Sequence, residues 1–305
     1  MGESREYIWF DGEVVESEKA KISVKSHSLH YGTAVFEGIR AYPGDDNLYV
    51  FRLQEHMNRL LNSARMLHIK AKYSSNELVE ATVELIRRNN YRGQLYIRPI
   101  IFLGDGGINL DYSKHPVHTS IFALPLASYF QKEGLRVCIS SWRRISSSSM
   151  LPRSKASANY LNSCLATIEA KLAGYDEAIL LDQNGYVSEG SGENVFIVKN
   201  DKVYTPDIYS SILEGVTRDS VFKIAEDSGI KVETRQIDRS ELYTADEIFF
   251  TGTAAEITPV VEVDGRMIGR REKGKITGKI AELYRNAATG KVSKYKNWLT
   301  QVYSK

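Results

Sequence analysis

Cysteine, long apolar runs and an excess of charge of one sign are all scarce in this sequence, and each absence excludes a class of protein. Only two cysteines occur among the 305 residues, Cys138 and Cys164, and neither has metal-ligand spacing. No apolar run approaches the roughly 20 residues that a membrane-spanning helix needs, and the segment MGESREYIWF has no signal-like apolar core. We therefore expect a reduced, cytoplasmic protein without a bound metal.

The charge of the chain is almost balanced. Lys and Arg number 40 and Asp and Glu 38, which gives a formal net charge of +2. Proteins that hold nucleic acid or anionic membrane surfaces carry a marked positive excess. We therefore expect small-molecule partners, with no nucleic acid and no membrane.

Several widespread nucleotide and metal motifs are also missing. The sequence has no GxxxxGK[ST] phosphate loop, no GxGxxG before a helix, no HExxH and no Cys/His cluster. Two glycine-rich stretches remain, GDGG at 104–107 and EGSGEN at 189–194. Glycines beside strands usually mark turns, so neither stretch indicates a ligand site by itself.

The chain length favours two domains of roughly 120 to 180 residues each. We predict a smaller domain over residues 1–125, with a hairpin at YIWFDGEVV and buried strands at QLYIRPIIFLG and HTSIFALPL. Apolar residues at helical spacing predict a helix over 52–68, and a second helix is predicted over 76–89 with Ser74 or Ser75 as its cap. The segment 126–136 is predicted to be the interdomain loop.

The second predicted domain covers residues 137–305. It begins with a strand at LRVCISSW and continues through a long serine-rich loop, RRISSSSMLPRSKAS. Loops of this length in a compact domain tend to be functional or disordered. Helices are predicted near 160–173, 216–228 and 273–288, separated by strands and hairpins with Asn-Gly and Asn-Asp turns.

The candidate charged residues have ordinary explanations when each is taken alone. Lys155 in the serine-rich loop is typical of an exposed charge, and an ion pair with Glu55 one turn earlier explains Arg59. Glu189 and Glu193 lie four residues apart, which fits a solvated face better than a paired acid site. Single residues therefore do not reveal the function.

The combination of motifs is informative where single residues are not. The segments, in chain order, are HSLHYGTAVFEGIRAY at 27–42, EHMNRLLNSA at 55–64, YIRP at 96–99, SKASANYLNS at 154–163, SEGSGENVFIV at 188–198, TPDIYSSILEGVTRD at 205–219 and FTGTAAEITPV at 250–260. From about Trp9 to Leu299, the chain resembles the branched-chain amino-acid aminotransferases, which are fold-type IV enzymes dependent on pyridoxal 5′-phosphate (PLP). The resemblance implies an α+β fold with a smaller N-terminal α/β domain, a larger C-terminal domain with a β-barrel-like core, and an active site between them.

The resemblance also implies which residues hold PLP. Lys155 matches the catalytic lysine that carries the cofactor and moves the substrate proton, and Glu189 matches the carboxylate at the pyridine nitrogen. The remaining matches are Arg59, Val216, Thr217 and Thr253 at the phosphate, Tyr160 at the phenolic oxygen, Leu213 against the ring, and Glu193 and Asn194 beside Glu189. A phosphate at Val216 and Thr217 also makes independent sense, because a predicted helix begins there.

The implied substrates are L-leucine, L-isoleucine or L-valine with 2-oxoglutarate. Arg98 matches the residue that holds the distal carboxylate, and Ile108 matches one that reaches the active site of a neighbouring subunit, as in a homodimer at least, with hexamers also found among relatives. The other matching substrate residues are Tyr31, Phe36, Gly38, Tyr96, Leu126, Tyr129, Thr253 and Ala254.

Two departures and three rival activities accompany the resemblance. Leu126 in LPLASY stands where bacterial relatives often carry tryptophan, and the GDGGIN loop is shorter than theirs. The rivals on the same fold are D-amino-acid aminotransferases, (R)-amine transaminases and aminodeoxychorismate lyase, but FEGIR, YIRP and GTAAEI favour the L-branched-chain enzymes. A binding protein without enzymatic activity on the same scaffold would be expected to lack Lys155 or Glu189, and both are present.

Overall fold

The computed structural model describes residues 6–127, 129, 130, 132–270 and 272–303. Its chain forms two compact units, each with its own sheet. Unit 1 comprises Met1–Ala127, Ser154–Ala158 and Ala287–Lys305, and unit 2 comprises Ser128–Arg153 and Asn159–Asn286. The units thus differ from the expected domains, because two later segments return to unit 1. Ser128 and Gln131 of the expected interdomain loop lie outside the described residues.

Unit 1 is built on an antiparallel sheet with the order β17-β5-β4-β6-β7-β1-β2, and β3 pairs with β6. Its strands are β1 Tyr7–Phe10, β2 Glu13–Glu16, β3 Ala34–Phe36, β4 Ile39–Pro43, β5 Leu48–Phe51, β6 Leu95–Leu103, β7 Val117–Pro125 and β17 Leu299–Gln301. The hairpin of β1 and β2 turns through Asp11 and Gly12, both at positive φ, as the Asp-Gly pair predicts. The return of β17 to pair with β5 was not predicted, because three residues carry too little periodicity to be recognised.

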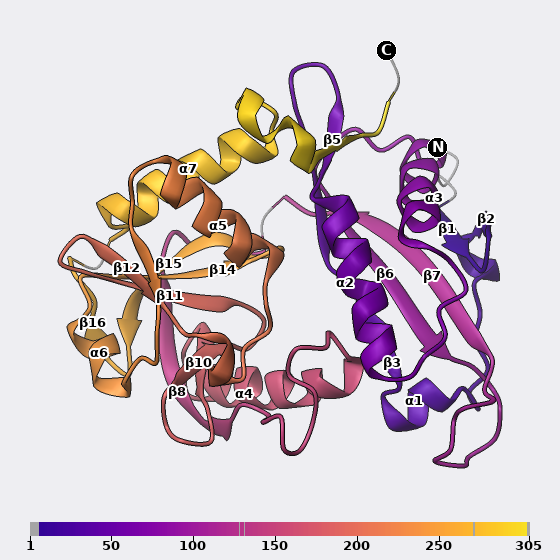
Figure 1. Ribbon diagram of the computed structural model, residues 1–305, viewed down its shortest axis with the longest axis horizontal. Helices are drawn as coiled ribbons and strands as arrows, with labels where there is room; N and C mark the ends of the chain where they lie inside the picture. Colours follow the sequence, from indigo (N-terminus) through magenta and orange to yellow (C-terminus); the bar gives the residue numbers. More distant parts are fainter. Residues whose placement is uncertain (1–5, 128, 131, 271, 304–305) are drawn as a thin grey trace. The chain divides into compact units, whose positions relative to one another are not determined.

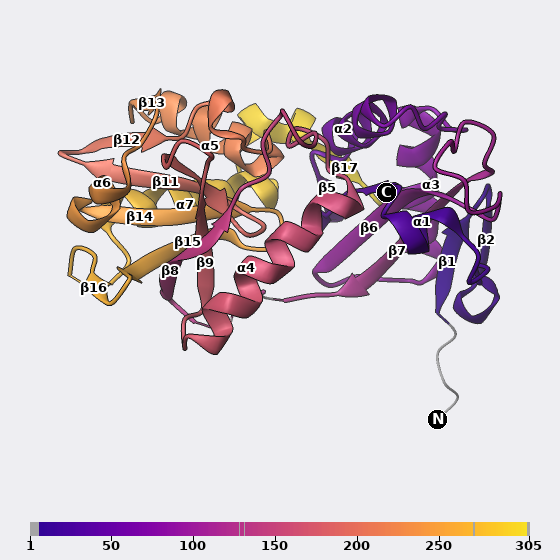
Figure 2. The same cartoon turned by 90° about the horizontal axis from the view of Figure 1, so that it is seen from below.

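Two helices, α2 Leu53–Met66 and α3 Ser75–Arg88, cover one face of the unit 1 sheet (Figures 1 and 2). The unit also contains α1 His27–Tyr31 and short 3-10 helices at Ser17–Lys19 and Ser293–Trp298. The predicted helices over 52–68 and 76–89 correspond to α2 and α3. Leu53, Met57 and Leu60 of α2 are buried in one apolar cluster with sheet residues such as Ile97. The apolar face predicted for this helix is therefore the face that packs against the sheet.

Unit 2 contains a mixed sheet with the order β10-β9-β8-β15-β14-β11-β12-β13, and β16 pairs with β15. Its strands are β8 Leu135–Arg143, β9 Glu177–Leu181, β10 Val187–Gly190, β11 Asn194–Lys199, β12 Lys202–Thr205, β13 Val232–Thr234, β14 Glu247–Gly252, β15 Glu256–Val263 and β16 Arg266–Met267. In a flat sheet with this strand order, β10 and β11 would lie five strand spacings apart, about 24 Å. The link between Gly190 and Asn194 spans at most about 15 Å, so the sheet must curl. This curl confirms the predicted barrel-like core.

The pleat of this sheet sends alternate side chains to two different apolar clusters. Ile248 and Phe250 of β14 lie in the cluster enclosed by the curled sheet. Phe249 lies in another cluster, with Val221 of the helix Val216–Asp227 and Ile280 of the helix Lys275–Ala288. The helices are α4 Tyr160–Leu172, α5 Val216–Asp227, α6 Arg239–Thr244 and α7 Lys275–Ala288, with 3-10 helices at Ser157–Asn159 and Ile208–Ser210. Residues 144–156 form a long loop as predicted, with only one isolated bridge, between Val35 and Ala156.

Within the described part of the chain, no helix combines the length and the apolar character that crossing a membrane requires.

Candidate functional site

Lys155 lies in unit 1, where its backbone is fixed on both sides. Its N–H donates to the Ser63 hydroxyl of α2 at 3.0 Å, and its carbonyl accepts from the Phe36 N–H at 3.0 Å. The next residue, Ala156, forms the isolated bridge to Val35. Segment 154–158 therefore lies along β3 like a short extra strand, and the Lys155 amine lies 5.2 Å from the centre of the Phe36 ring.

Arg59 on α2 is held by a buried carboxylate. Its Nε and Nη2 donate to the two oxygens of Glu37 at 2.6 and 2.8 Å, and His56 Nδ1 lies 2.8 Å from Glu37 Oε2. This corrects the expected ion pair with Glu55, which pairs instead with Arg52 at 2.8 Å. The expectation failed because it considered only neighbours on the helix, whereas Glu37 comes from the turn between β3 and β4.

The buried cluster has a defined charge state. Burial alone would raise the pKa of the Glu37 carboxyl, but Arg59 and His56 more than offset that effect and hold the pKa well below its usual range. Burial lowers the pKa of His56, so its imidazole is neutral at pH 7 and donates to Glu37 through Nδ1–H. The cluster therefore consists of one carboxylate, one guanidinium and one neutral ring.

Phe36 also connects Lys155 to the residues predicted for substrate. The Arg98 guanidinium carbon lies 4.5 Å from the centre of the Phe36 ring, and Arg98 Nη2 donates to the Tyr96 hydroxyl at 2.7 Å. A Cβ on Gly38 would lie 2.3 Å from that hydroxyl, so only glycine leaves room for Tyr96 there. Five predicted residues thus form one connected group in unit 1.

Three other predicted substrate residues occupy separate positions in unit 1. The Tyr31 hydroxyl donates to the Ile108 carbonyl at 3.0 Å, which joins α1 to the GDGGIN loop. Leu126 is half-buried, and its carbonyl accepts from Nη2 of the buried Arg40 at 2.8 Å.

In unit 2, Glu189 accepts hydrogen bonds from three directions. Arg144 Nε donates to Oε1 at 2.8 Å, and Asn194 Nδ2 and the Leu213 N–H donate to Oε2, each at 3.0 Å. A register shift between Val187 and Glu189 marks a bulge in β10, of the kind that re-aims a side chain. All three donors favour the ionised carboxylate, so Glu189 presents a fixed negative charge.

The hydrogen bonds around Glu189 extend, through Asn194, to the residues that precede α5. Asn194 also donates to the Leu213 carbonyl at 2.8 Å. A Cβ on Gly215, the N-cap of α5, would lie 2.2 Å from the Asn194 side-chain oxygen. Glycine therefore allows Asn194 to approach the helix start, where Val216 and Thr217 begin α5 as predicted, without a capping side chain. Glu193 Oε2 accepts from the Gly192 N–H at 3.1 Å.

The structure also identifies partners that the sequence analysis missed. Arg144, buried against Glu189, was interpreted only as part of a polar loop, and it contacts Asn162 of α4 at 3.3 Å. Glu37 was overlooked although it carries a signal, an acidic residue inside the otherwise apolar run AVFEGI. Tyr160 begins α4, and Thr253 and Ala254 form the turn between β14 and β15.

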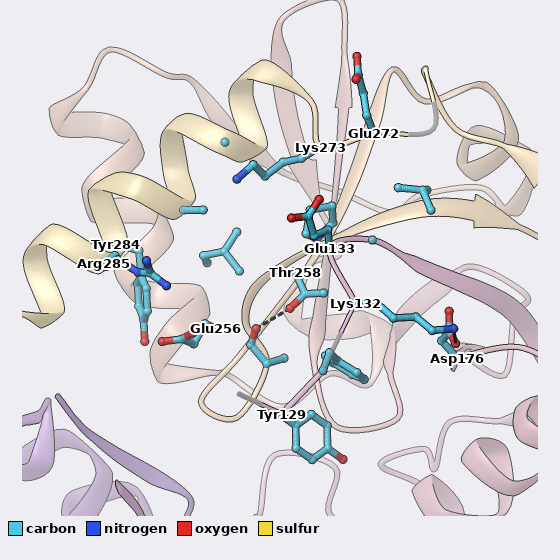
Figure 3. Close-up of a pocket in the computed structure, with 18 of the residues that line it drawn as sticks. Tyr129, Lys132, Glu133, Asp176, Glu256, Thr258, Glu272, Lys273, Tyr284 and Arg285 are labelled. Carbon is cyan, nitrogen blue, oxygen red and sulfur yellow. Dashed lines mark hydrogen bonds and ion pairs between the residues drawn. The ribbon is translucent and has the colours of Figure 1, made fainter. Parts of the chain in front are cut away.

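Unit 2 contains a cavity of about 830 Å³. Two of the predicted substrate residues, Tyr129 and Ala254, line it, together with charged residues that include Glu256 and Lys273 (Figure 3). At its edge Lys132 pairs with Asp176 at 2.6 Å. The predicted site residues are therefore divided between the two units.

Comparison with known proteins gives one consistent family. The amino-transferase class IV model matches residues 34–263. A probable branched-chain-amino-acid aminotransferase of Aquifex aeolicus is 47% identical over 99% of this chain and 98% of its own length. Among solved structures, the branched-chain aminotransferase of Thermoproteus uzoniensis with norvaline is 49% identical with a TM-score of 0.95, covering 98% of this chain and 100% of that one.

A second solved relative contains the cofactor. The branched-chain amino acid aminotransferase of Thermobaculum terrenum, in its PLP-bound holo form, is 38% identical with a TM-score of 0.93, covering 99% of this chain and 100% of that one. These matches extend over nearly the whole of each chain and confirm the predicted fold type. The chain therefore belongs to amino-transferase class IV and, within it, to the PLP-dependent branched-chain-amino-acid aminotransferases.

Proposed function

We propose that this enzyme transfers the amino group of L-leucine, L-isoleucine or L-valine to 2-oxoglutarate, giving the branched-chain 2-oxo acid and L-glutamate in two half-reactions. The observation that carries the proposal is the surroundings of Phe36. The Lys155 amine lies 5.2 Å from the centre of the Phe36 ring, and the Arg98 guanidinium carbon lies 4.5 Å from it. An apolar wall with a reactive amine and a carboxylate-binding cation is what the two kinds of substrate require.

Arg98 supports acceptance of 2-oxoglutarate and glutamate. Its Nε is buried without a hydrogen-bond partner in the described structure, while its Nη2 donates to Tyr96. A buried donor without an acceptor is costly, and a distal carboxylate would supply a charge-assisted bond. The other proposed substrate contacts are Tyr31, Phe36, Gly38, Tyr96, Ile108, Leu126, Tyr129, Thr253 and Ala254.

The residues present fit PLP, and we propose that Lys155 and Glu189 are among those that would hold it. Glu189 offers a fixed carboxylate for the ring nitrogen, and the start of α5 offers main-chain amides and a positive dipole end for a phosphate. Arg59, oriented by Glu37, offers the guanidinium. The other proposed contacts are Tyr160, Glu193, Asn194, Leu213, Val216, Thr217 and Thr253.

The chain's own residues then have distinct tasks. PLP supplies the sink for the electrons released when the substrate Cα loses its proton. Lys155 Nζ would hold the cofactor between turnovers and would then move that proton. Its main chain is fixed by Ser63 and Phe36, so the amine works from a defined anchor. Glu189, kept ionised by Arg144 and Asn194, favours a proton on the ring nitrogen.

We also propose that the enzyme is a homodimer at least, because Ile108 would act in the site of a neighbouring copy. Its side chain is 78% exposed, which supports a contact outside its own chain.

The test is the visible absorbance of the purified enzyme before and after L-leucine, for wild type, Lys155→Ala and the exposed-lysine control Lys70→Ala. Wild type and the control should show the band of the lysine-bound cofactor, and L-leucine should bleach it. Lys155→Ala should lack that band. A wild type without a band after incubation with PLP would contradict the cofactor assignment, and a band bleached only by D-amino acids or amines would contradict the substrate assignment.

A further inference from the structure

The GDGGIN loop, residues 104–109, presents apolar side chains to solvent. Ile108 is 78% exposed, and Leu110, the residue after the loop, is 76% exposed. Mobile surface loops are usually polar, so exposed aliphatic side chains there indicate a contact that the isolated chain does not make. The direction of the Ile108 side chain is set by the main chain of this loop.

Three consecutive carbonyls of this loop accept hydrogen bonds from three aromatic side chains. His115 Nε2 lies 3.1 Å from the Gly107 carbonyl, the Tyr31 hydroxyl donates to the Ile108 carbonyl at 3.0 Å, and His27 Nε2 lies 3.0 Å from the Asn109 carbonyl. A carbonyl can only accept, so both imidazoles carry their proton on Nε2. The main chain on both sides of the Ile108 side chain is thereby fixed.

The two imidazoles are themselves held in place. His27 is 1% exposed and its Nδ1 lies 2.8 Å from the Thr33 hydroxyl. His115 is 8% exposed, and its ring centre lies 4.6 Å from that of His27. The Tyr31 ring lies 4.5 Å from the His27 ring. The three donors therefore form one packed cluster rather than three independent side chains.

The loop backbone is shaped to fit this cluster. A Cβ on Gly106 would lie 2.5 Å from His115 Cδ2, so glycine permits the loop to lie directly on the imidazole. Gly107 has φ +104°, a conformation that favours glycine. Of the three glycines in residues 104–109, Gly106 thus allows contact with His115 and Gly107 allows the positive φ, which the glycine-rich pattern alone did not indicate.

We propose that His115, together with His27, is a positioning residue that sets the preference for branched-chain substrates. It acts by fixing the carbonyls of residues 107–109, and hence the side chain of Ile108. The inference rests on the proposed function, in which Ile108 contacts the substrate side chain. His115 contacts the loop and the His27 ring, so it would act on the substrate through Ile108.

The test uses PLP-loaded full-length enzyme and three variants. His115→Phe keeps a ring but removes the donor, His115→Gln restores an N–H near the place of Nε2, and His68→Asn removes an exposed imidazole of the same unit as a control. We would measure steady-state kinetics with L-leucine and L-alanine, and hydrogen–deuterium exchange of residues 104–110.

His115→Phe should exchange faster in this loop. It should also lower the ratio of kcat/KM for L-leucine to that for L-alanine about fivefold, the factor that a net hydrogen bond of about 1 kcal/mol gives. The change should lie in KM for L-leucine rather than in kcat. His115→Gln should recover most of the ratio, and His68→Asn should match wild type.

Two results would overturn the inference. An unchanged substrate ratio with faster exchange would show that the loop does not set specificity, and an unchanged exchange rate would show that His115 does not hold the loop. A wild type inactive toward L-leucine would instead refute the proposed function, and the specificity role with it.

Discussion

Glu37 is fully buried, and its carboxylate joins two side chains of α2. Oε1 and Oε2 accept from Arg59, and Oε2 also accepts from the neutral His56. Both partners are hydrogen-bond donors. An amide in place of the carboxylate would therefore point its own N–H donor at one of these donors, and that hydrogen bond would be lost. Glu37 thus orients Arg59, the proposed phosphate residue, without being a ligand itself.

Glu37→Gln is therefore expected to weaken the binding of PLP to the apoenzyme roughly tenfold, about 1.4 kcal/mol. Removing a negative charge would by itself favour a phosphate, but the lost orientation of Arg59 should outweigh that gain. The measurement is a titration of apoenzyme with PLP followed by protein fluorescence. Glu55→Gln on α2, the helix that carries Arg59, is the control, because Glu55 pairs with Arg52 instead. Unchanged or tighter binding in Glu37→Gln would refute the orienting role.

At this scale the sequence motifs named candidate site residues but not the residues that pair with them. Lys155, Arg59 and Glu189 were predicted as site residues from whole motifs, because each motif carries its residue in a fixed place. Glu37 and Arg144 were missed, since their partners Arg59 and Glu189 are 22 and 45 positions away. Such pairs depend on how strands and helices pack against one another. The spacing of residues within one element does not predict that packing.

At the scale of elements, α3 shows how local chemistry fixes a helix start. The Ser74 hydroxyl accepts from the Glu77 N–H at 3.3 Å, and Glu77 Oε2 accepts from the Ser74 N–H at 2.7 Å. This capping box resolves the choice between Ser74 and Ser75, because Ser75 is already the first helical residue.

Ser74→Ala should lower the free energy of unfolding by about 1 kcal/mol, because the first turn loses an acceptor for its N–H groups. Ser75→Ala should change it by less than about 0.5 kcal/mol. Chemical denaturation of both variants, followed by circular dichroism, measures the difference. Equal losses in the two variants would contradict the assignment of the cap.

Elements whose signal lies within one segment were predicted well, and strands defined by distant partners were not. The stripe of α2 and the Asp-Gly hairpin carry their signals within one segment. The parallel strand β13 and the terminal strand β17, each three residues long, become strands only through pairing with β12 and β5. Their hydrogen bonds come from distant partners, so local propensity was too weak to identify them.

At the scale of the whole molecule, the chain does not divide at a single point. Lys155 and the strand β17 belong to unit 1, although both follow the start of unit 2 in the sequence. The serine-rich loop therefore returns Lys155, the proposed catalytic residue, to β3, the strand that contains Phe36. The sequence analysis placed the domain boundary at a single linker and so did not predict that later segments rejoin unit 1. Amino-acid composition does not indicate which strand a segment will pair with.

The proposed contribution of Ile108 to a neighbouring copy leads to a prediction about mixed assemblies. Lys155→Ala removes the reactive amine but leaves Ile108 intact, whereas Ile108→Asp should cost at least roughly tenfold in kcat/KM for L-leucine by placing a charge at an apolar contact. Each variant alone should therefore have little activity. Co-expressed in equal amounts they should regain about a quarter of wild-type activity, because half of the dimers are mixed and each mixed dimer has one complete site.

The control is a chain that carries both changes, co-expressed with Lys155→Ala. No pairing of these chains supplies an amine, so activity should stay at background. If Ile108 acted within its own subunit, the site with Lys155 in a mixed dimer would still carry the introduced carboxylate in place of the isoleucine, and co-expression of the single variants would restore nothing. Size-exclusion chromatography of each mixture would establish that mixed assemblies had formed, so that a failure to regain activity would count against the shared site.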